Sequence, residues 1–253
     1  MELTELKRRK FQGVLNILSF NRHFYVIGLS VLALIILTFL FFNLPHAWLW
    51  LVVAAFFYGL IMPLIVSAYV YDFSGYYDFN WLDTLNLPQS KPMQIVNINA
   101  GFDETSFILK SKFQESDLNV YDFYNAQQHT EPAIVRARKV SQVYPGTAQI
   151  SSNKIPLADQ SVDLVFLLSA VHEIRSHTEK VAFLKECHRI CKPEGRVITV
   201  EHLRDTPNFF AFSIGFTHFF SRNTWKKAYK EAGFTTMAES KLTPFMSVFD
   251  CRP

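Results

Sequence analysis

Residues 155–174, IPLADQSVDLVFLLSAVHEI, and residues 186–205, ECHRICKPEGRVITVEHLRD, decide the fold of this 253-residue chain. An apolar strand opens at Asp163-Leu164-Val165, a helix is predicted over 179–190, and after a turn at 192–195 a second strand runs over 196–200. Strands this apolar are typical of a parallel sheet that helices cover on both faces. The two stretches therefore predict a strand–helix–strand unit of an α/β domain.

The same alternation extends over residues 94–253. Further strands are predicted at 94–98, 118–121, 147–150, 235–239 and 246–251. Three further helices are predicted: one from about Glu104, one over 131–143 and one over 221–232. Asp103 is well placed to cap the first of these helices, and Gly233 ends the last. This order predicts an α/β fold with a Rossmann-like, doubly wound sheet.

Two uncharged apolar runs precede this domain, at 24–42 and 47–70. Each is long enough to cross a hydrocarbon core, which needs about 20 apolar residues. The short link between them permits only a tight turn, so we expect a two-helix transmembrane hairpin rather than two buried core helices or a signal peptide. We expect four parts: a basic N-terminus (1–23), the hairpin (24–70), a connector (71–93) and the α/β domain (94–253).

The charges beside the hairpin predict its orientation. Five basic residues precede the first run and none lies in the link: Lys7, Arg8, Arg9, Lys10 and Arg22. By the positive-inside rule the N-terminus is cytoplasmic, and two crossings return the domain to the same side. We also expect the aromatic residues Tyr69, Tyr71, Tyr76, Tyr77 and Trp81 to lie at the membrane interface.

The overall charge and the cysteines exclude some classes of protein. The net charge of +3 is too small to indicate nucleic-acid binding, and a lipid bilayer is the simpler partner for the basic N-terminus. Cys187, Cys191 and Cys251 give no disulfide framework, in agreement with a reducing cytoplasm. The sequence does not predict the oligomeric state.

The two opening stretches resemble the second half of class I S-adenosylmethionine-dependent methyltransferases, in particular the methyltransferase type 11, quinone-biosynthesis-like branch. There a segment of the form LPF.d.sFDlV is followed by E..RvLkPGG, and the order and spacing here are similar. With the hairpin in front, the chain looks like a membrane-anchored, bacterial member of this group. The resemblance implies S-adenosylmethionine as the cofactor.

The resemblance also implies where that cofactor would bind. The glycine-rich turn of the family aligns with residues 97–103, in which Gly101 is retained while Asn97 replaces the acidic residue, Asn99 the first glycine and Asp103 the last. Asn adopts positive φ more readily than most residues, so the turn could still form. The remaining implied contacts are Asp122 at the end of the second strand for the ribose hydroxyls, and Ser151, Asn153 and Ser169 in later loops.

Candidate acceptor-side residues follow the fourth and fifth strands, because open α/β sheets bind ligands at the carboxyl ends of their strands. His172, Glu173 and His202 are the catalytic candidates, with His172 able to act as a base if the acceptor must lose a proton. Arg204, Asp205 and His218 are substrate candidates, in a segment rich in phenylalanine. The alternatives are helix capping and internal salt bridges.

No metal site is predicted. His172 and His177 are five residues apart, whereas two zinc ligands on one helix face are four apart. Cys187, His188 and Cys191 lack a second ligand cluster, so packing in a buried helix is the simpler explanation.

These observations favour a membrane-anchored S-adenosylmethionine-dependent methyltransferase that acts on a lipophilic or membrane-associated small molecule. The alternative is a non-catalytic, methyltransferase-like binding or scaffolding module at the membrane, which the altered glycine turn favours. A nicotinamide-dependent reductase is a weaker alternative, because the Gly-x-Gly-x-x-Gly pattern is missing.

Overall fold

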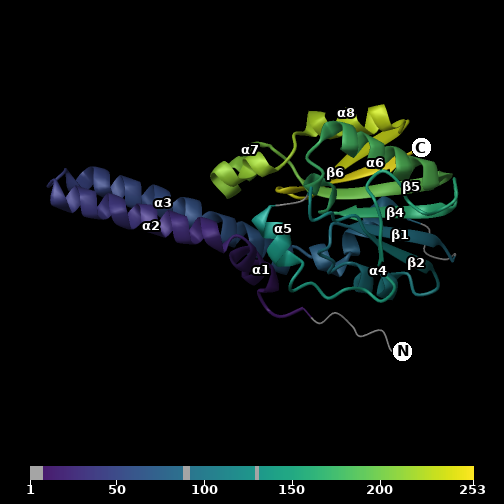
Figure 1. Cartoon of the computed structure of the whole chain (residues 1–253), viewed down its shortest axis with the longest axis horizontal. Coiled ribbons are helices and arrows are strands. Elements are labelled where there is room, and N and C mark those ends of the chain that lie inside the picture. Colours follow the sequence, from purple (N-terminus) through teal and green to yellow (C-terminus); the bar gives the residue numbers. More distant parts are fainter. Residues whose placement is uncertain (1–7, 88–91, 129–130) are drawn as a thin grey trace.

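Seven strands form one mixed sheet in the order β3-β2-β1-β4-β5-β7-β6, in a computed structural model that describes residues 8–87, 92–128 and 131–253 (Figure 1). Neighbouring strands are parallel except at β7, which is antiparallel to β5 and β6. The strands are β1 (Gln94–Asn99), β2 (Asp117–Asp122), β3 (Ala148–Gln149), β4 (Val162–Leu168), β5 (Cys191–His202), β6 (Thr236–Thr243) and β7 (Met246–Arg252). The predicted doubly wound, Rossmann-like sheet is confirmed.

Alternate side chains of the central strands feed two separate cores. On β4, Val165 and Leu167 belong to one core while Leu164 and Phe166 belong to the other, and all four are at most 2% exposed. This follows from the two-residue period of a strand that is covered on both faces.

Helices α6 (His177–Ile190) and α8 (Arg222–Ala232) cover one face and lie side by side (Figure 1). Their N-termini are capped by Ser176 and Ser221, whose hydroxyls accept a hydrogen bond from the third residue along. Helix α4 (Ser106–Lys112), with the short turns that precede β1, contributes to the core on the other face.

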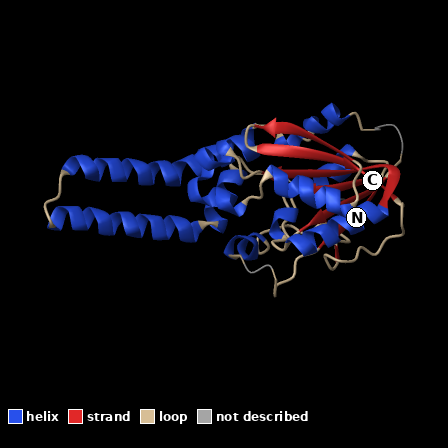
Figure 2. Cartoon of the chain, turned by 90° about the horizontal axis from the view of Figure 1, so that it is seen from above, coloured by secondary structure: helices blue, strands red, loops and turns tan. Residues whose placement is uncertain are grey.

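Two long helices, α2 (Arg22–Phe41) and α3 (His46–Ala68), project from the domain side by side (Figures 1 and 2). Both are long and apolar enough to cross a membrane, and only 6% of the most apolar window of each is buried within the chain. They do not serve as core helices of this domain. The helix α1 (Gln12–Phe20) precedes them and packs against α3 and against α5 (Pro132–Ala137).

The connector is folded into the domain. Helix α3 continues into a π-helical turn, η1 (Tyr69–Phe73), followed by the 3₁₀ turns η2 (Tyr76–Asp78) and η3 (Asn80–Leu85). Tyr76 and Trp81 are 2% and 8% exposed and belong to the second core, so the prediction that they lie at a membrane interface is wrong. The sequence gives no means of distinguishing an interfacial aromatic cluster from one that packs under a sheet. Residues 88–91 of the predicted connector, and Lys7 of the basic segment, lie outside the described residues.

Two predicted boundaries are wrong for identifiable reasons. Residues 192–195, predicted as a turn, belong to β5 as a bulge, because the partners jump from Val162↔Cys191 to Leu164↔Arg196. The helix predicted over 131–143 is α5 and ends at Ala137, because Val140 and Val143 are 62% and 69% exposed and have no core to pack against. After β5 the chain forms α7 (Thr206–Phe212) and the 3₁₀ turn η5 (Ser213–His218), and η4 (Val171–Glu173) follows β4.

Candidate active site

The carboxyl ends of β1, β2 and β4 lie next to one another and bring the predicted cofactor-side residues together. Asn99 and Asp122 are direct neighbours across β1 and β2. The Asn99 Oδ1 accepts a hydrogen bond of 2.7 Å from the backbone N–H of Gly101, whose φ is +88°. The altered turn therefore still forms, with an Asn side chain stabilising the left-handed glycine.

Arg138 fills the space above this turn. The Nη1 atom of Arg138 lies 1.6 Å from where a Cβ on Gly101 would be, so only a glycine lets the guanidinium come this close to the turn. The same Nη1 lies 2.7 Å from the Asp122 Oδ2, and the guanidinium stacks over the Tyr124 ring at 4.0 Å from its centroid. The carboxylate predicted to hold a ribose is therefore already paired with a cation of the chain itself.

Asn97 and Asp103 support the turn from beneath. Asn97 is 1% exposed and donates to the hydroxyls of Thr105 (3.0 Å) and Ser106 (2.8 Å). The Asp103 Oδ1 accepts from the backbone N–H groups of Thr105 and Ser106, both at 2.9 Å, just before α4, whose N-cap residue is Thr105 rather than the predicted Asp103. These contacts hold the loop in place, and they leave the second carboxylate oxygen of Asp103 without a partner among the described residues.

The remaining cofactor-side predictions have different surroundings. Ser151 and Asn153 are exposed and bond to each other at 2.8 Å, beyond β3. Ser169 ends β4 with a φ of +51°, an uncommon conformation for a residue other than glycine. Such backbone strain occurs most often at functional sites.

Two buried polar atoms at this edge have no hydrogen-bond partner among the described residues, Asn99 Nδ2 and Asp103 Oδ2, while the Ser169 hydroxyl interacts with Tyr76. Buried polar atoms in native proteins are nearly always paired, so an unpaired group at a strand end indicates a ligand. A donor amide, a hydroxyl and the Asp122 carboxylate suit a polar nucleoside-containing cofactor once Arg138 moves aside. The residues present therefore fit S-adenosylmethionine.

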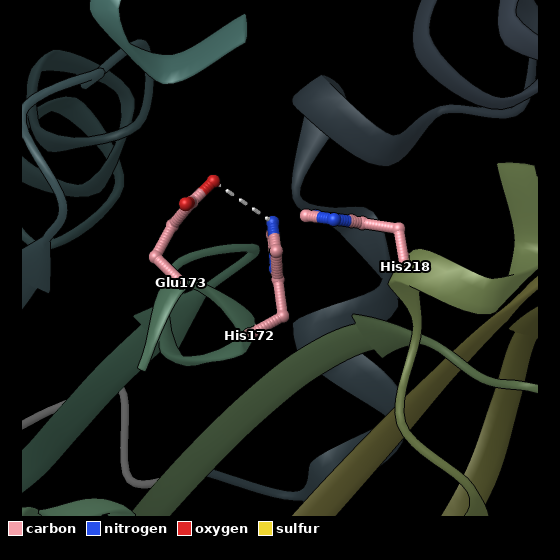
Figure 3. A group of neighbouring side chains, drawn as sticks. All are labelled: His172, Glu173 and His218. Carbon is pink, nitrogen blue, oxygen red and sulfur yellow. Dashed lines mark ion pairs between the residues drawn. The ribbon is translucent and has the colours of Figure 1, made fainter. Parts of the chain in front are cut away.

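The acceptor-side residues His172, Glu173 and His218 lie together beyond the ends of β4 and β5 (Figure 3). His172 is held by Glu201 at the end of β5, with Nδ1 2.7 Å from one carboxylate oxygen, and its Nε2 lies 3.4 Å from Glu173. His218 comes from η5, and its Nδ1 lies 3.1 Å from the carboxylate of Glu131, just before α5. Three loops far apart in the sequence therefore meet at one point.

Charges in this group affect each other strongly. Burial alone would lower the pKa of His172, but the carboxylates of Glu201 and Glu173 outweigh it and raise the pKa to about 10. Burial likewise opposes ionisation of Glu173, yet its bond to His172 lowers the pKa of that carboxyl. At neutral pH His172 is therefore a charged donor, which makes it a poor general base.

His202 occupies a different environment. It is 7% exposed and stacks on Phe219 with ring centroids 4.9 Å apart. Its Nδ1 lies 3.0 Å from the Phe245 carbonyl, and its Nε2 lies 2.9 Å from the Tyr71 hydroxyl. Burial lowers the pKa of His202 to about 4. With Nδ1 protonated toward the carbonyl and Nε2 accepting from Tyr71, the ring favours a structural role over acid–base chemistry.

Arg204 and Asp205 organise the segment after β5. The Arg204 guanidinium donates to the carbonyls of Phe219 and Thr217, and the Asp205 Oδ1 accepts from the backbone N–H of Asn208 at 3.1 Å and caps α7. These contacts favour the internal-bonding alternative over direct substrate binding.

Several residues of the site are absent from the predicted set. Lys180 is 1% exposed, its Nζ has no hydrogen-bond partner among the described residues, and it lies 2.9 Å from the centroid of the Phe220 ring. Burial lowers the pKa of its amine to about 7. Its helical spacing with Phe183, Leu184 and Cys187 is a signal that could have identified it as buried. For Arg138 and Glu131 the sequence offers no comparable signal.

Comparison with known proteins agrees with this architecture. Residues 114–199 match the family model described as a methyltransferase domain. A SAM-dependent methyltransferase from Aquifex aeolicus is similar at 16% identity over 71% of this chain and 93% of its own, with a TM-score of 0.51. A candidate O-methyltransferase from Nostoc punctiforme PCC 73102 is similar at 14% identity over 78% of this chain and 60% of its own, also with a TM-score of 0.51. No curated protein sequence matches the chain.

The shared fold confirms the predicted methyltransferase-type architecture, and the family match agrees with the predicted class over residues 114–199. The match to a methyltransferase domain agrees with the predicted enzyme class, and S-adenosylmethionine is the cofactor that this resemblance implies.

Proposed function

We propose that this chain is a membrane-anchored S-adenosylmethionine-dependent methyltransferase whose acceptor is a lipophilic or membrane-associated small molecule. One observation carries the proposal. Tyr71, in the π-helical turn that directly continues α3, hydrogen-bonds at 2.9 Å to His202 at the end of β5. The apolar hairpin thus joins the domain at the strand edge where the acceptor would bind, and both the N-terminus and the domain would be cytoplasmic.

The segment after β5 supports a lipid-facing acceptor site. Phe209, Phe210 and Ile214 are 47%, 57% and 82% exposed. Helix α7 lies beside α3, where the Tyr58 hydroxyl donates a 2.6 Å hydrogen bond to the Phe210 carbonyl (Figure 1). Tyr58 is near the middle of α3, so a bilayer that surrounds the hairpin would also take up these exposed apolar side chains. In water the same patch would be a liability, whereas at a membrane its burial is favourable.

The residues at the strand edge would have separate roles toward the cofactor and the acceptor. Asp122, Asn99 and Ser169 would hold the cofactor, and Gly101 leaves room for it. When bound, S-adenosylmethionine supplies an electrophilic methyl group. His172, fixed by Glu201, would lie beside the acceptor and orient it. Because methyl transfer is an in-line displacement, such positioning is the largest contribution that a protein of this kind can make.

Methyl transfer by the full-length protein in liposomes tests the proposal. With methyl-labelled S-adenosylmethionine, label should enter solvent-extractable products of a total lipid extract and not a pool of water-soluble metabolites. Asp122→Ala should abolish transfer, while Asp159→Ala, at an exposed carboxylate paired with Arg189, should leave it unchanged. Label that enters only water-soluble products would refute the lipophilic acceptor.

A second candidate is the non-catalytic module. The ion pair of Arg138 with Asp122, and the neutral Asn97 in place of an acid, favour it. Cofactor binding without transfer to any fraction would support this candidate over the enzyme.

A further inference from the structure

We infer that His172, Glu173 and His218 form a binding site for a divalent transition-metal ion, which holds an oxygen atom of the methyl acceptor. The role of the ion rests on the proposed function, whereas the binding of the ion does not.

The three side chains converge. One potential ligand atom of each lies within 4.8 Å of the others, and Figure 3 shows the Glu173 carboxylate and the His218 ring on either side of the His172 ring. Metal–ligand bonds to nitrogen and oxygen are about 2.0–2.2 Å long, so two ligands of one ion are up to about 4.4 Å apart. Small side-chain rotations would therefore bring all three groups onto a single ion.

The groups around the two histidines match the outer shell of a metal site. A metal-binding histidine usually donates its other ring N–H to a carboxylate, which fixes the ring and its tautomer. Here the Nδ1 of His172 lies 2.7 Å from Glu201, and the Nδ1 of His218 lies 3.1 Å from Glu131. In both rings Nδ1 faces a carboxylate, so we assign the ion to the Nε2 side, where the Nε2 of His172 lies 3.4 Å from the third ligand, Glu173.

The loops that carry these ligands are tied to each other. One Nη1 of Arg175 donates to the His172 carbonyl at 3.1 Å and to the His218 carbonyl at 2.7 Å. This bridge holds the turn after β4 against η5 even though the two segments are distant in the sequence. The side chains of His172 and Glu173 are 17% and 10% exposed, so the site is largely shielded while one side remains reachable.

The charge balance favours a cation. Three carboxylates, from Glu131, Glu173 and Glu201, surround the two imidazoles, and Arg175 and Lys180 are the nearby cations. The Arg175 guanidinium is directed at backbone carbonyls and the Lys180 amine at the Phe220 ring, so neither cation forms an ion pair with these carboxylates in the described part of the chain. The position between His172 and Glu173 therefore favours positive charge, carried either by a proton or by a metal ion.

The ligand set selects the type of ion and of acceptor. Two imidazoles and one carboxylate favour Zn²⁺, Mn²⁺, Fe²⁺ or Co²⁺ over Mg²⁺ and Ca²⁺, and three ligands leave positions open. An open position would take the oxygen of a hydroxyl-bearing acceptor and lower its pKa. The O–H proton then passes to water, the oxygen forms the new O–CH₃ bond, and the sulfonium sulfur keeps the electron pair of the broken S–CH₃ bond. The acceptor class is thus a lipophilic molecule with a hydroxyl group.

Metal binding to the full-length, detergent-solubilised and chelator-treated protein tests the inference. Equilibrium dialysis against Zn²⁺, Mn²⁺ and Mg²⁺ should show about one transition-metal ion per chain and weaker binding of Mg²⁺. Glu173→Gln and His218→Gln should each weaken binding by more than about tenfold. The matched control is His177→Gln, because His177 forms an exposed pair with Glu231 at 2.8 Å and is not one of the three ligands.

Binding of S-adenosylmethionine is measured on the same samples. The inference is supported if the two site variants lose metal binding but keep cofactor binding, while the control variant keeps both. No stoichiometric metal, metal retained in both site variants, or Mg²⁺ bound as tightly as Zn²⁺ overturns it. Metal binding as expected without cofactor binding would refute the proposed function and leave the metal site standing.

Discussion

Replacing Arg138 by alanine should tighten the binding of S-adenosylmethionine. In the structure the Arg138 guanidinium lies over Gly101 and pairs with Asp122, the residue expected to accept the ribose hydroxyls. The cofactor must break this pair before it can bind. The apparent affinity of wild-type protein is reduced by the free energy of that step, and the variant does not incur it.

The magnitude follows from two contacts. The Arg138 and Asp122 side chains are 31% and 11% exposed, and a partly exposed ion pair contributes about 1 kcal/mol. The stacking of Arg138 over Tyr124, at 4.0 Å, adds roughly 1 kcal/mol. Removal of both should lower the dissociation constant by roughly 30-fold, since 1.4 kcal/mol corresponds to a factor of ten.

Equilibrium binding of S-adenosylmethionine and S-adenosylhomocysteine to the detergent-solubilised full-length protein measures the effect. Arg222→Ala is the control, because Arg222 forms its ion pair with Glu239 and not with Asp122. Thermal unfolding of each variant shows whether it is folded. An unchanged or higher dissociation constant in a folded Arg138→Ala protein would refute the reasoning and would indicate that Arg138 contacts the bound cofactor.

Three further changes have expected outcomes. Lys180→Met should raise Tm by roughly 6–12 °C at pH 6, because the lowered pKa of about 7 costs the folded state about 5 kcal/mol below pH 7 while the stacking on Phe220 offsets about 2 kcal/mol. This cost disappears as the pH rises toward 10.5, so an equal gain in Tm at pH 10 would contradict the cause. Gly101→Ala should lower Tm by several degrees, because φ at this position is +88° and the new Cβ would meet Arg138. The loss of Tm should be smaller in an Arg138→Ala background, and equal losses in the two backgrounds would argue against the contact. Asp205→Ala should cost about 1 kcal/mol of stability by removing the cap of α7, measured as a lower Tm against Asp159→Ala, and an unchanged Tm would show that the cap contributes nothing.

The strands and long helices were predictable because their signals are local. The apolar run of β4 and the capped helix α6 are specified by residue spacing and by the residues at their ends. The errors lie where tertiary contacts decide the outcome. Residues 192–195 form a bulge because β4 pairs on both sides of them, and Tyr76 and Trp81 are buried because the connector folds back under the sheet.

The candidate site was predictable only in part. Positions at strand ends follow from topology, so Asp122, Ser169, His172 and Glu173 could be named in advance. The partners that determine what these residues do come from distant loops. Spacing along the sequence could compare His172 only with His177, whereas His218 reaches His172 only through the fold. Arg138 likewise reaches Asp122 only because α5 is short and the chain turns back after it.

The continuous passage from α3 into η1 has a consequence for how far from the bilayer the reaction can take place. Val70 is completely buried, and the Asp72 carboxylate accepts hydrogen bonds from the backbone N–H groups of Gly13 and Val14 at the start of α1. In the proposed membrane-bound state the domain therefore cannot swing on a loose tether. In that state its strand edge would stay at a fixed height above the bilayer, and the protein would select acceptors by the depth of their reactive group.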